Sequence, residues 1–125
     1  MNKEWKVLYY SRQDGSRPVE EYINNLTLNE QAKTLAYINL LQEKGPNLPR
    51  PYADLLEDGI HELRVKLRGA QVRFLYFFCY QNIIIITNVF DKHTKKVPQE
   101  KINIAKYNRT DFLSRYSEEE LRRLK

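Results

Sequence analysis

The chain has 125 residues, about the size of one domain, and its 42% hydrophobic content with nine Tyr, five Phe and one Trp excludes a disordered protein. Its single cysteine, Cys79, excludes an internal disulfide and a cysteine-based zinc cluster, and no signal peptide or membrane-spanning run is visible, so we expect a cytoplasmic protein without metal or cofactor. The net charge of +5 and the isoelectric point near 9.3 favour a polyanionic partner.

The first part of the chain predicts one strand and a short helix. The run Trp5–Tyr10 is rich in aromatic and β-favouring residues, and Asp14-Gly15 predicts the turn that follows it. Pro18 suits the first turn of a helix, where the N–H that proline lacks is not needed. This helix should end near Leu26.

A second helix is expected next, capped by Thr27 or Asn29 and ended by Gly45-Pro46. Its apolar face should lie on residues at helical spacing, widened by neighbouring aliphatic side chains. These residues are Leu28, Ala32, Leu35, Ala36 and Asn39, with Ile38, Leu40 and Leu41 beside them. The segment from Asn47 to Asp58 contains two prolines and is predicted to be a loop.

Three successive antiparallel strands are predicted in the middle of the chain. In Ile60–Arg68 apolar and charged residues alternate, which gives one apolar and one cationic face. The tight connection at Gly69 makes Val72–Cys79 pair antiparallel with this strand. The almost wholly apolar run Ile83–Phe90 is typical of a central strand covered on both sides.

The last part predicts a basic loop over Asp91–Val97 and a helix opened by Pro98. The inner face of this helix should comprise Ile102, Ala105, Phe112, Leu113 and Tyr116. Strands and helices are segregated, so the sequence predicts an α+β fold with a sheet of about four strands. We expect one domain over residues 1–116 and a charged tail or helix extension over 117–125.

Basic residues concentrate in one stretch of the chain. Between Gly59 and Lys96 there are seven of them, opposed only by Glu62 and Asp91, so this stretch carries the whole positive excess. The strand alternation places Arg64, Lys66 and Arg68 on one face, and Arg73 can face them across the hairpin. The loop after the central strand can close such a site. A cationic site is therefore predicted here.

A cationic site can cleave RNA without a metal, because the ribose 2′-OH can attack the neighbouring phosphate. Arginine binds phosphate oxygens as a planar fork, lysine among other cations can exchange protons near neutral pH, and histidine titrates there by itself. The candidate catalytic residues are Arg64, Lys66, Arg73, Lys92, His93 and Lys96, and the candidate RNA-binding residues are Arg68, Lys95 and Tyr80.

These residues also have structural interpretations. Charges on an exposed strand face usually serve solvation, and Arg73 can be a buried partner of Glu62. Tyr80 lies at a turn, where it can stack on a base or remain exposed.

The segment from Gly59 to Phe78 resembles the phage-derived, HigB-like branch of the RelE/ParE toxin superfamily. That branch shows a Glu-Leu-Arg strand followed by an Arg-x-x-Tyr strand, here Glu62-Leu63-Arg64 and Arg73-Phe74-Leu75-Tyr76. An apolar strand, a lysine-rich loop and a helix opened by proline come next, here Ile83–Phe90, Asp91–Val97 and Pro98. The residues before the Glu-Leu-Arg strand also match that branch, here Pro51, Tyr52, Leu55 and Gly59.

The resemblance implies a RelE-like, microbial-RNase-type fold, in which helices flank a twisted antiparallel sheet. It implies a toxin of a type II toxin–antitoxin system that cuts mRNA on the ribosome, with a helix-turn-helix antitoxin as partner. By position, the basic residues of the family are matched by Arg64, Lys66, Arg73, Lys92 and Lys96. The chain departs from the family at His93, where a second lysine is usual, and it has no Tyr between Pro98 and Lys106. The identity of the general base therefore stays open.

Two other functions fit the same sequence. A ParE-like toxin would inhibit DNA gyrase on the same scaffold without nuclease residues, since a fold does not determine a function. A phage or plasmid regulator without catalytic activity would use the basic face only to bind nucleic acid or a protein.

Overall fold

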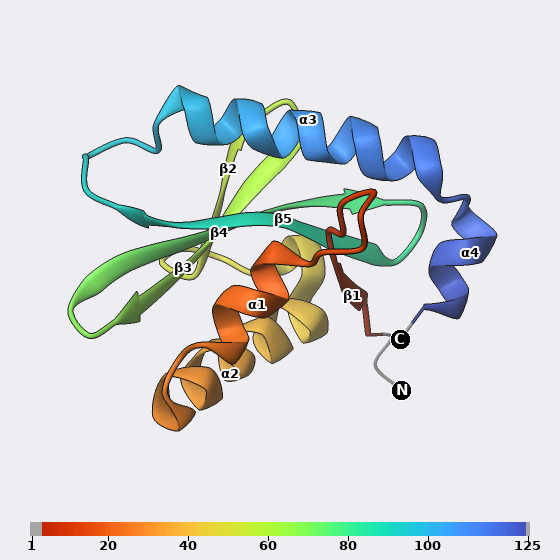
Figure 1. Ribbon diagram of the computed structural model, residues 1–125. Coiled ribbons are helices and arrows are strands. Elements are labelled where there is room, and N and C mark those ends of the chain that lie inside the picture. Colours follow the sequence, from red (N-terminus) through yellow and green to blue (C-terminus); the bar gives the residue numbers. More distant parts are fainter. Residues whose placement is uncertain (1–3, 125) are drawn as a thin grey trace.

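The structure is a computed structural model that describes residues 4–124, and a five-stranded sheet lies at its centre (Figure 1). The strands lie side by side in the order β1-β5-β4-β3-β2. Their bounds are β1 (Lys6–Tyr9), β2 (Ala53–Glu57), β3 (Ile60–Leu67), β4 (Ala70–Cys79) and β5 (Ile83–Lys92). The α+β class predicted from the sequence is confirmed, whereas the specific RelE-like fold stays a prediction.

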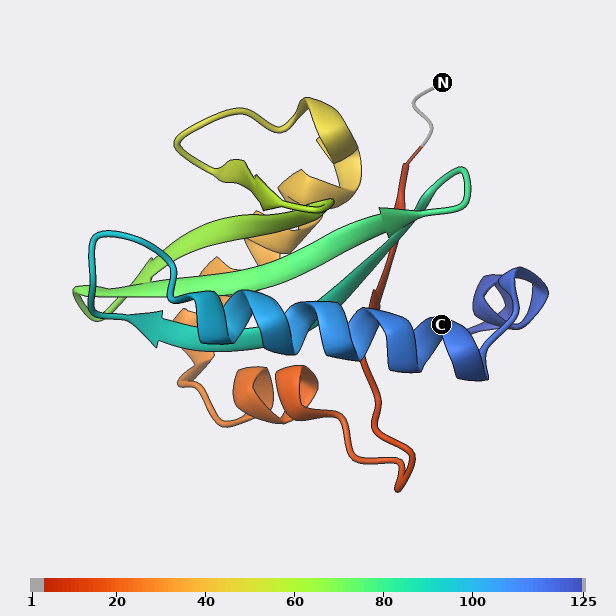
Figure 2. The same cartoon turned by 90° about the horizontal axis from the view of Figure 1, so that it is seen from above.

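Helices cover both faces of the sheet (Figures 1 and 2). On one face lie α1 (Pro18–Asn24) and α2 (Leu28–Lys44), which ends in the short 3₁₀ helix η1 (Gly45–Asn47). On the other face lies α3 (Gln99–Arg115), followed by α4 (Glu118–Arg123). The sheet therefore separates two apolar cores, one around Phe74 and Ile84 and one around Leu75 and Phe112. Among the described residues, no helix combines the length and the apolar character needed to cross a membrane.

Two tight hairpins set the register of β2, β3 and β4. Glu57 pairs with Ile60 and Leu67 pairs with Ala70, so each turn has two central residues. Both central residues have positive φ in each turn, at Asp58-Gly59 and at Arg68-Gly69. This is the combination of a type I′ turn, whose twist matches that of the flanking strands and which favours glycine. The predicted antiparallel pairing across Gly69 is confirmed.

Two features of the sheet differ from the prediction. The predicted loop over residues 47–58 contains the strand β2, which forms by pairing with the otherwise open edge of β3. The strand β1 runs parallel to β5, so the sheet is not wholly antiparallel. The β1–β5 pairing joins segments distant in sequence, which local residue preferences do not encode. The β2–β3 pairing is local, and the two-residue Asp58-Gly59 turn is a hairpin signal that the loop prediction missed.

The buried face of α2 also differs from the prediction. Thr27 caps the helix through a capping box with Glu30, as one of the two predicted caps, and the helix ends at Gly45 as expected. However, Leu28 and Leu35 are exposed. The helix buries Ile38 and Leu41, as predicted, together with Glu30 and Thr34, which were not predicted. The polar members of this face include Glu30, whose carboxylate takes part in the capping box and lies 2.5 Å from Nε of Arg68.

The C-terminal part is more regular than predicted. Of the five residues expected on the inner face of α3, Ile102, Ala105 and Phe112 are buried. A break at Tyr116 and Ser117 separates α3 from α4, which has its own capping box at Ser117. Leu121 of α4 is fully buried in the second core. The described part of the predicted tail is therefore packed helix, and residue 125 lies outside the described residues.

Candidate functional site: a basic hollow beside the third helix

A one-residue bulge decides which side chains of β5 lie beside those of β3 and β4. Tyr76 pairs with Ile86, whereas Leu75 pairs with Asn88, so Thr87 is the extra residue. Side chains alternate along a strand, and an extra residue shifts this alternation. Before the bulge, Ile83 and Ile85 face α3; after it, the residues on this face are Asn88, Phe90 and Lys92. The bulge thus places Lys92 on the same face as Arg73.

The bulge is held by hydrogen bonds. Thr87 is fully buried, and its Oγ1 lies 3.1 Å from the carbonyl oxygen of Leu75 and 2.6 Å from Oδ1 of Asn88. From α3, Nδ2 of the buried Asn108 donates to the carbonyl oxygen of Thr87 at 3.1 Å. The single hydroxyl hydrogen of Thr87 is donated to one of these two acceptors at a time, and the Asn108 bond satisfies the Thr87 carbonyl oxygen at the bulge.

Two arginines face each other on neighbouring strands and share one buried carboxylate. Arg64 of β3 pairs directly with Arg73 of β4 in the sheet register. Glu62, which is 3% exposed, lies 2.9 Å from Nε of Arg73 through its Oε1 and 3.0 Å from Nη2 of Arg64 through its Oε2. Asp54 of β2 lies 3.4 Å from the same Arg64 nitrogen. The carboxylates therefore fix both guanidinium groups in place.

Arg73 is the buried member of this pair, with 6% of its surface exposed. Burial lowers the pKa of its guanidinium and the Glu62 carboxylate opposes this change, and an arginine remains charged in either case. Within the described chain, Arg73 contacts protein oxygens through Nε and through Nη1, which donates to the carbonyl oxygen of Val72 at 3.3 Å. Its Nη2 has no hydrogen-bond or ion-pair partner among the described residues.

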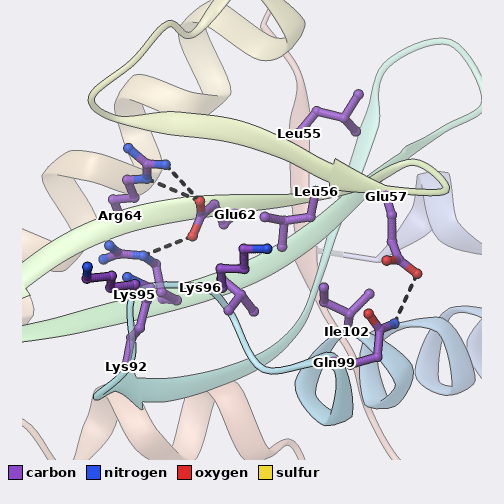
Figure 3. Close-up of a pocket in the computed structure, with 12 residues that line it drawn as sticks. Leu55, Leu56, Glu57, Glu62, Arg64, Lys92, Lys95, Lys96, Gln99 and Ile102 are labelled. Atoms are coloured by element: carbon purple, nitrogen blue, oxygen red, sulfur yellow. Dashed lines mark hydrogen bonds and ion pairs between the residues drawn. The ribbon is translucent and has the colours of Figure 1, made fainter.

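These arginines line a hollow that three lysines complete (Figure 3). The hollow has a volume of about 430 Å³. It lies between the sheet, the loop before α3 and the first turn of α3. Lys92 comes from the end of β5, and Lys95 and Lys96 come from the loop between β5 and α3. Among residues 4–124, these lysines have no carboxylate within ion-pair distance. We call this site the basic hollow.

The opposite rim of the basic hollow is anchored to α3. Glu57, at the end of β2, accepts a hydrogen bond from Nε2 of Gln99 at 3.1 Å and forms an ion pair with Lys106. Lys106 also lies 2.7 Å from Oδ2 of Asp58. The Lys106 ammonium lowers the pKa of both carboxyl groups. These contacts hold the β2–β3 hairpin against α3, so that the rim is built before any ligand binds.

Four of the predicted site residues lie outside the basic hollow. Lys66 is exposed and lies at the neighbouring edge of β3, and Arg68 pairs with Glu30 of α2. His93 is an exposed loop residue that does not line the hollow. Tyr80 lies in the β4–β5 turn, at the other end of the sheet from Lys92 (Figures 1 and 2). The five predicted residues brought together are Arg64, Arg73, Lys92, Lys95 and Lys96.

Three residues that hold or position side chains of the candidate site were not predicted as part of it. Glu62 was expected to oppose Arg73, but the sequence did not show that it joins two arginines. Thr87 and Asn108 hold the bulge that places Lys92, and neither carries a motif. A polar Thr-Asn pair that interrupts the apolar run Ile83–Phe90 was the available signal for a bulge, because such a residue pair fits poorly in a strand buried on both faces.

The arrangement suits a ligand with several negatively charged oxygens. Five basic side chains and two acidic ones line the basic hollow, and one of the acidic ones, Glu62, is already shared by two arginines. Its volume falls in the range of about 300–1,000 Å³ that is usual for small-ligand sites. A planar guanidinium group and mobile ammonium groups together can bind a phosphate from several sides.

Comparison with known proteins gives one match to a family. Residues 21–110, which run from within α1 to within α3, match a family described as phage derived protein Gp49-like (DUF891). The match covers all the residues that line the basic hollow. A search of curated proteins gives no significant match.

Proposed function

Because the chain belongs to the Gp49-like family of phage-derived proteins, we propose that it is the toxin of a toxin–antitoxin pair and that it cleaves mRNA on the ribosome. The family is consistent with such a toxin, and the resemblance of the β3–β4 hairpin to the HigB-like branch supports the same function. The observation that carries the proposal is the convergence on one hollow of Arg64, Arg73 and three lysines that have no ion-pair partner in the described part of the chain.

In the proposed reaction, a phosphodiester of single-stranded RNA lies in the basic hollow. The 2′-OH gives up its proton to solvent water as its oxygen attacks the adjacent phosphorus, which gives a 2′,3′-cyclic phosphate and releases the 5′ oxygen of the next nucleotide. Nη2 of Arg73 and the lysine ammonium groups stabilise the extra negative charge of the transition state. Of the groups lining the hollow, an ammonium group of Lys92, Lys95 or Lys96 is suited to protonate the leaving oxygen.

The antitoxin is proposed to inhibit by covering this site. Leu55 lines the edge of the basic hollow, and 57% of its surface is exposed. A protein segment that combines carboxylates with an apolar side chain would match this surface. The gyrase-inhibiting alternative requires no such convergence of cations, and for this reason the ribonuclease is favoured.

Replacing Lys95 and Lys96 together by Ala is expected to weaken RNA binding in a salt-dependent manner. Each phosphate that a lysine no longer neutralises should reduce the slope of log affinity against log salt by about 0.7 for a single strand, so the pair should reduce it by about 1.4. The measurement is the affinity for a short single-stranded RNA, made non-cleavable by 2′-O-methylation, over a series of salt concentrations.

The matched control removes two positive charges elsewhere. Lys44 and Arg123 belong to α2 and α4 and do not line the basic hollow. The variant Lys44→Ala/Arg123→Ala has the same net charge as Lys95→Ala/Lys96→Ala and should keep the wild-type slope. Equal slopes in the two variants would show that the affinity for RNA depends on the net charge of the protein and not on this site.

A further inference from the structure

A second hollow lies next to the basic hollow, at the edge of β3 that β2 leaves unpaired. It has a volume of about 270 Å³, and two tyrosine rings form its apolar part, Tyr37 from α2 and Tyr52 from the segment before β2. Lys66 and Gln71 supply polar groups on strands β3 and β4. Arg64 and Arg73 line this hollow as well as the basic hollow, so the two hollows meet at the arginine pair.

We infer that this second hollow binds the base of the nucleotide next to the phosphate in the basic hollow, by stacking the base on Tyr52. A nucleotide carries an anionic phosphate and an aromatic base in one unit, and the adjacent hollows offer cations and aromatic rings in the same order. Aromatic side chains bind bases of single-stranded RNA in this way. The inference rests on the proposed function, because it requires RNA in the basic hollow.

The geometry of the two tyrosines assigns the stacking surface to Tyr52. The ring centroids lie 5.8 Å apart at an interplanar angle of 61°, so the rings meet edge to face and do not cover each other. The ammonium group of Lys33 lies over the Tyr37 ring at 5.9 Å from its centroid. The Tyr52 side of the pair is the open one, with 37% of that residue exposed.

The polar groups of the second hollow suit the edge of a base. Gln71 is exposed, and its side-chain amide both donates and accepts hydrogen bonds, as the edge of any base requires. Lys66 is exposed on the strand next to it and pairs with Gln71 in the sheet register. This gives Lys66, which lies outside the basic hollow, a place in the same RNA-binding surface.

The backbone around Tyr52 is held without its side chain, so the residue can be replaced. The Tyr52 carbonyl oxygen accepts from the Arg64 backbone N–H at 2.8 Å, and the Tyr52 N–H donates to the Pro49 carbonyl oxygen at 3.0 Å. Both hydrogen bonds remain possible in Tyr52→Ala. Thermal unfolding of Tyr52→Ala and Tyr52→Phe checks that both variants fold.

The test removes the Tyr52 side chain and the RNA bases separately and together, and compares the effects on affinity as in a double-mutant cycle. The probes are a short 2′-O-methylated RNA and an abasic strand with the same phosphates, and the measurement is their affinity for wild type, Tyr52→Ala and Tyr52→Phe. We expect Tyr52→Ala to bind the RNA roughly 5- to 150-fold more weakly, the effect of removing one stacked base. Tyr52→Phe should bind it as wild type does, and the abasic strand should bind equally to all three proteins.

The outcomes separate the two proposals. RNA binding that depends on Lys95 and Lys96 but is unchanged in Tyr52→Ala would overturn the base site and leave the proposed function in place. RNA binding that is unchanged in Lys95→Ala/Lys96→Ala would overturn both. Equal weakening for the RNA and the abasic strand in Tyr52→Ala would also overturn stacking, because the side chain would then contact the backbone.

Discussion

Replacing Arg73 by Ala is expected to reduce RNA cleavage by about 100- to 1,000-fold, the usual effect of removing one donor to a developing negative charge. The reason is that Arg73 lines the basic hollow and is held there by Glu62, and its Nη2 has no partner among the described residues. The same change should lower the free energy of unfolding by about 3 kcal/mol, since a buried carboxylate loses its nearest partner. Cleavage should therefore be measured well below the unfolding temperature of the variant.

A double variant distinguishes the catalytic role of Arg73 from its structural role. In Arg73→Ala/Glu62→Gln the buried carboxylate is replaced by a neutral amide, so most of the lost stability should return. Cleavage should stay as low as in Arg73→Ala, because no guanidinium group reaches the phosphate from β4. If the double variant regained wild-type cleavage, Arg73 would be only the partner of Glu62.

Replacing Thr87 by Val is expected to lower the free energy of unfolding by about 1–3 kcal/mol, although the two side chains have nearly the same shape. The valine leaves the carbonyl oxygen of Leu75 and Oδ1 of Asn88 without the buried hydroxyl. Because this bulge places Lys92 on the face of the basic hollow, cleavage should fall as well. Urea unfolding and a cleavage assay measure the two effects.

Thr34 provides a matched control for Thr87. It is also a fully buried threonine, but its Oγ1 has no hydrogen-bond partner among the described residues. Thr34→Val should therefore keep or slightly raise the free energy of unfolding, because a valine removes an unsatisfied buried hydroxyl. Equal destabilisation by the two changes would contradict the account of the bulge.

The antiparallel core of the sheet could be predicted because its signals are local. The alternation of Leu63, Val65 and Leu67 with charged residues sets the two faces of β3, and Gly69 marks the tight turn into β4. Once these are fixed, the direct pairing of Arg64 with Arg73 follows from the register alone. The two arginines of the candidate site were therefore within reach of sequence analysis.

The other parts depend on contacts that the sequence reveals less directly. β2 follows two prolines and pairs with β3 across the Asp58-Gly59 turn, a local hairpin signal whose first residue was assigned to the predicted loop. On α2, Leu28 and Leu35 have helical spacing but are exposed, whereas Ile38 and Leu41 pack in the core on the face that also buries Glu30 and Thr34. The placement of Lys92 depends on a bulge that shifts the side-chain alternation by one residue.

The convergence of loop residues was predictable only in part. Lys92, His93, Lys95 and Lys96 lie at or just after the end of one strand and have similar sequence environments. The bulge directs Lys92 to the basic hollow, whereas the path of the loop directs Lys95 and Lys96 there and leaves His93 exposed. Such a path depends on where α3 begins and how it packs, so no spacing rule separates the four residues.

The chemistry of the cut ends tests the central claim most directly. Purified protein is added to ribosomes programmed with an mRNA, and the ends of the fragments are identified by mass spectrometry. The account predicts 2′,3′-cyclic phosphate and 5′-hydroxyl ends, and no cut where the nucleotide before the bond is 2′-deoxy. Fragments with 5′-phosphate ends, or cleavage after a 2′-deoxynucleotide, would contradict attack by the 2′-OH in the basic hollow.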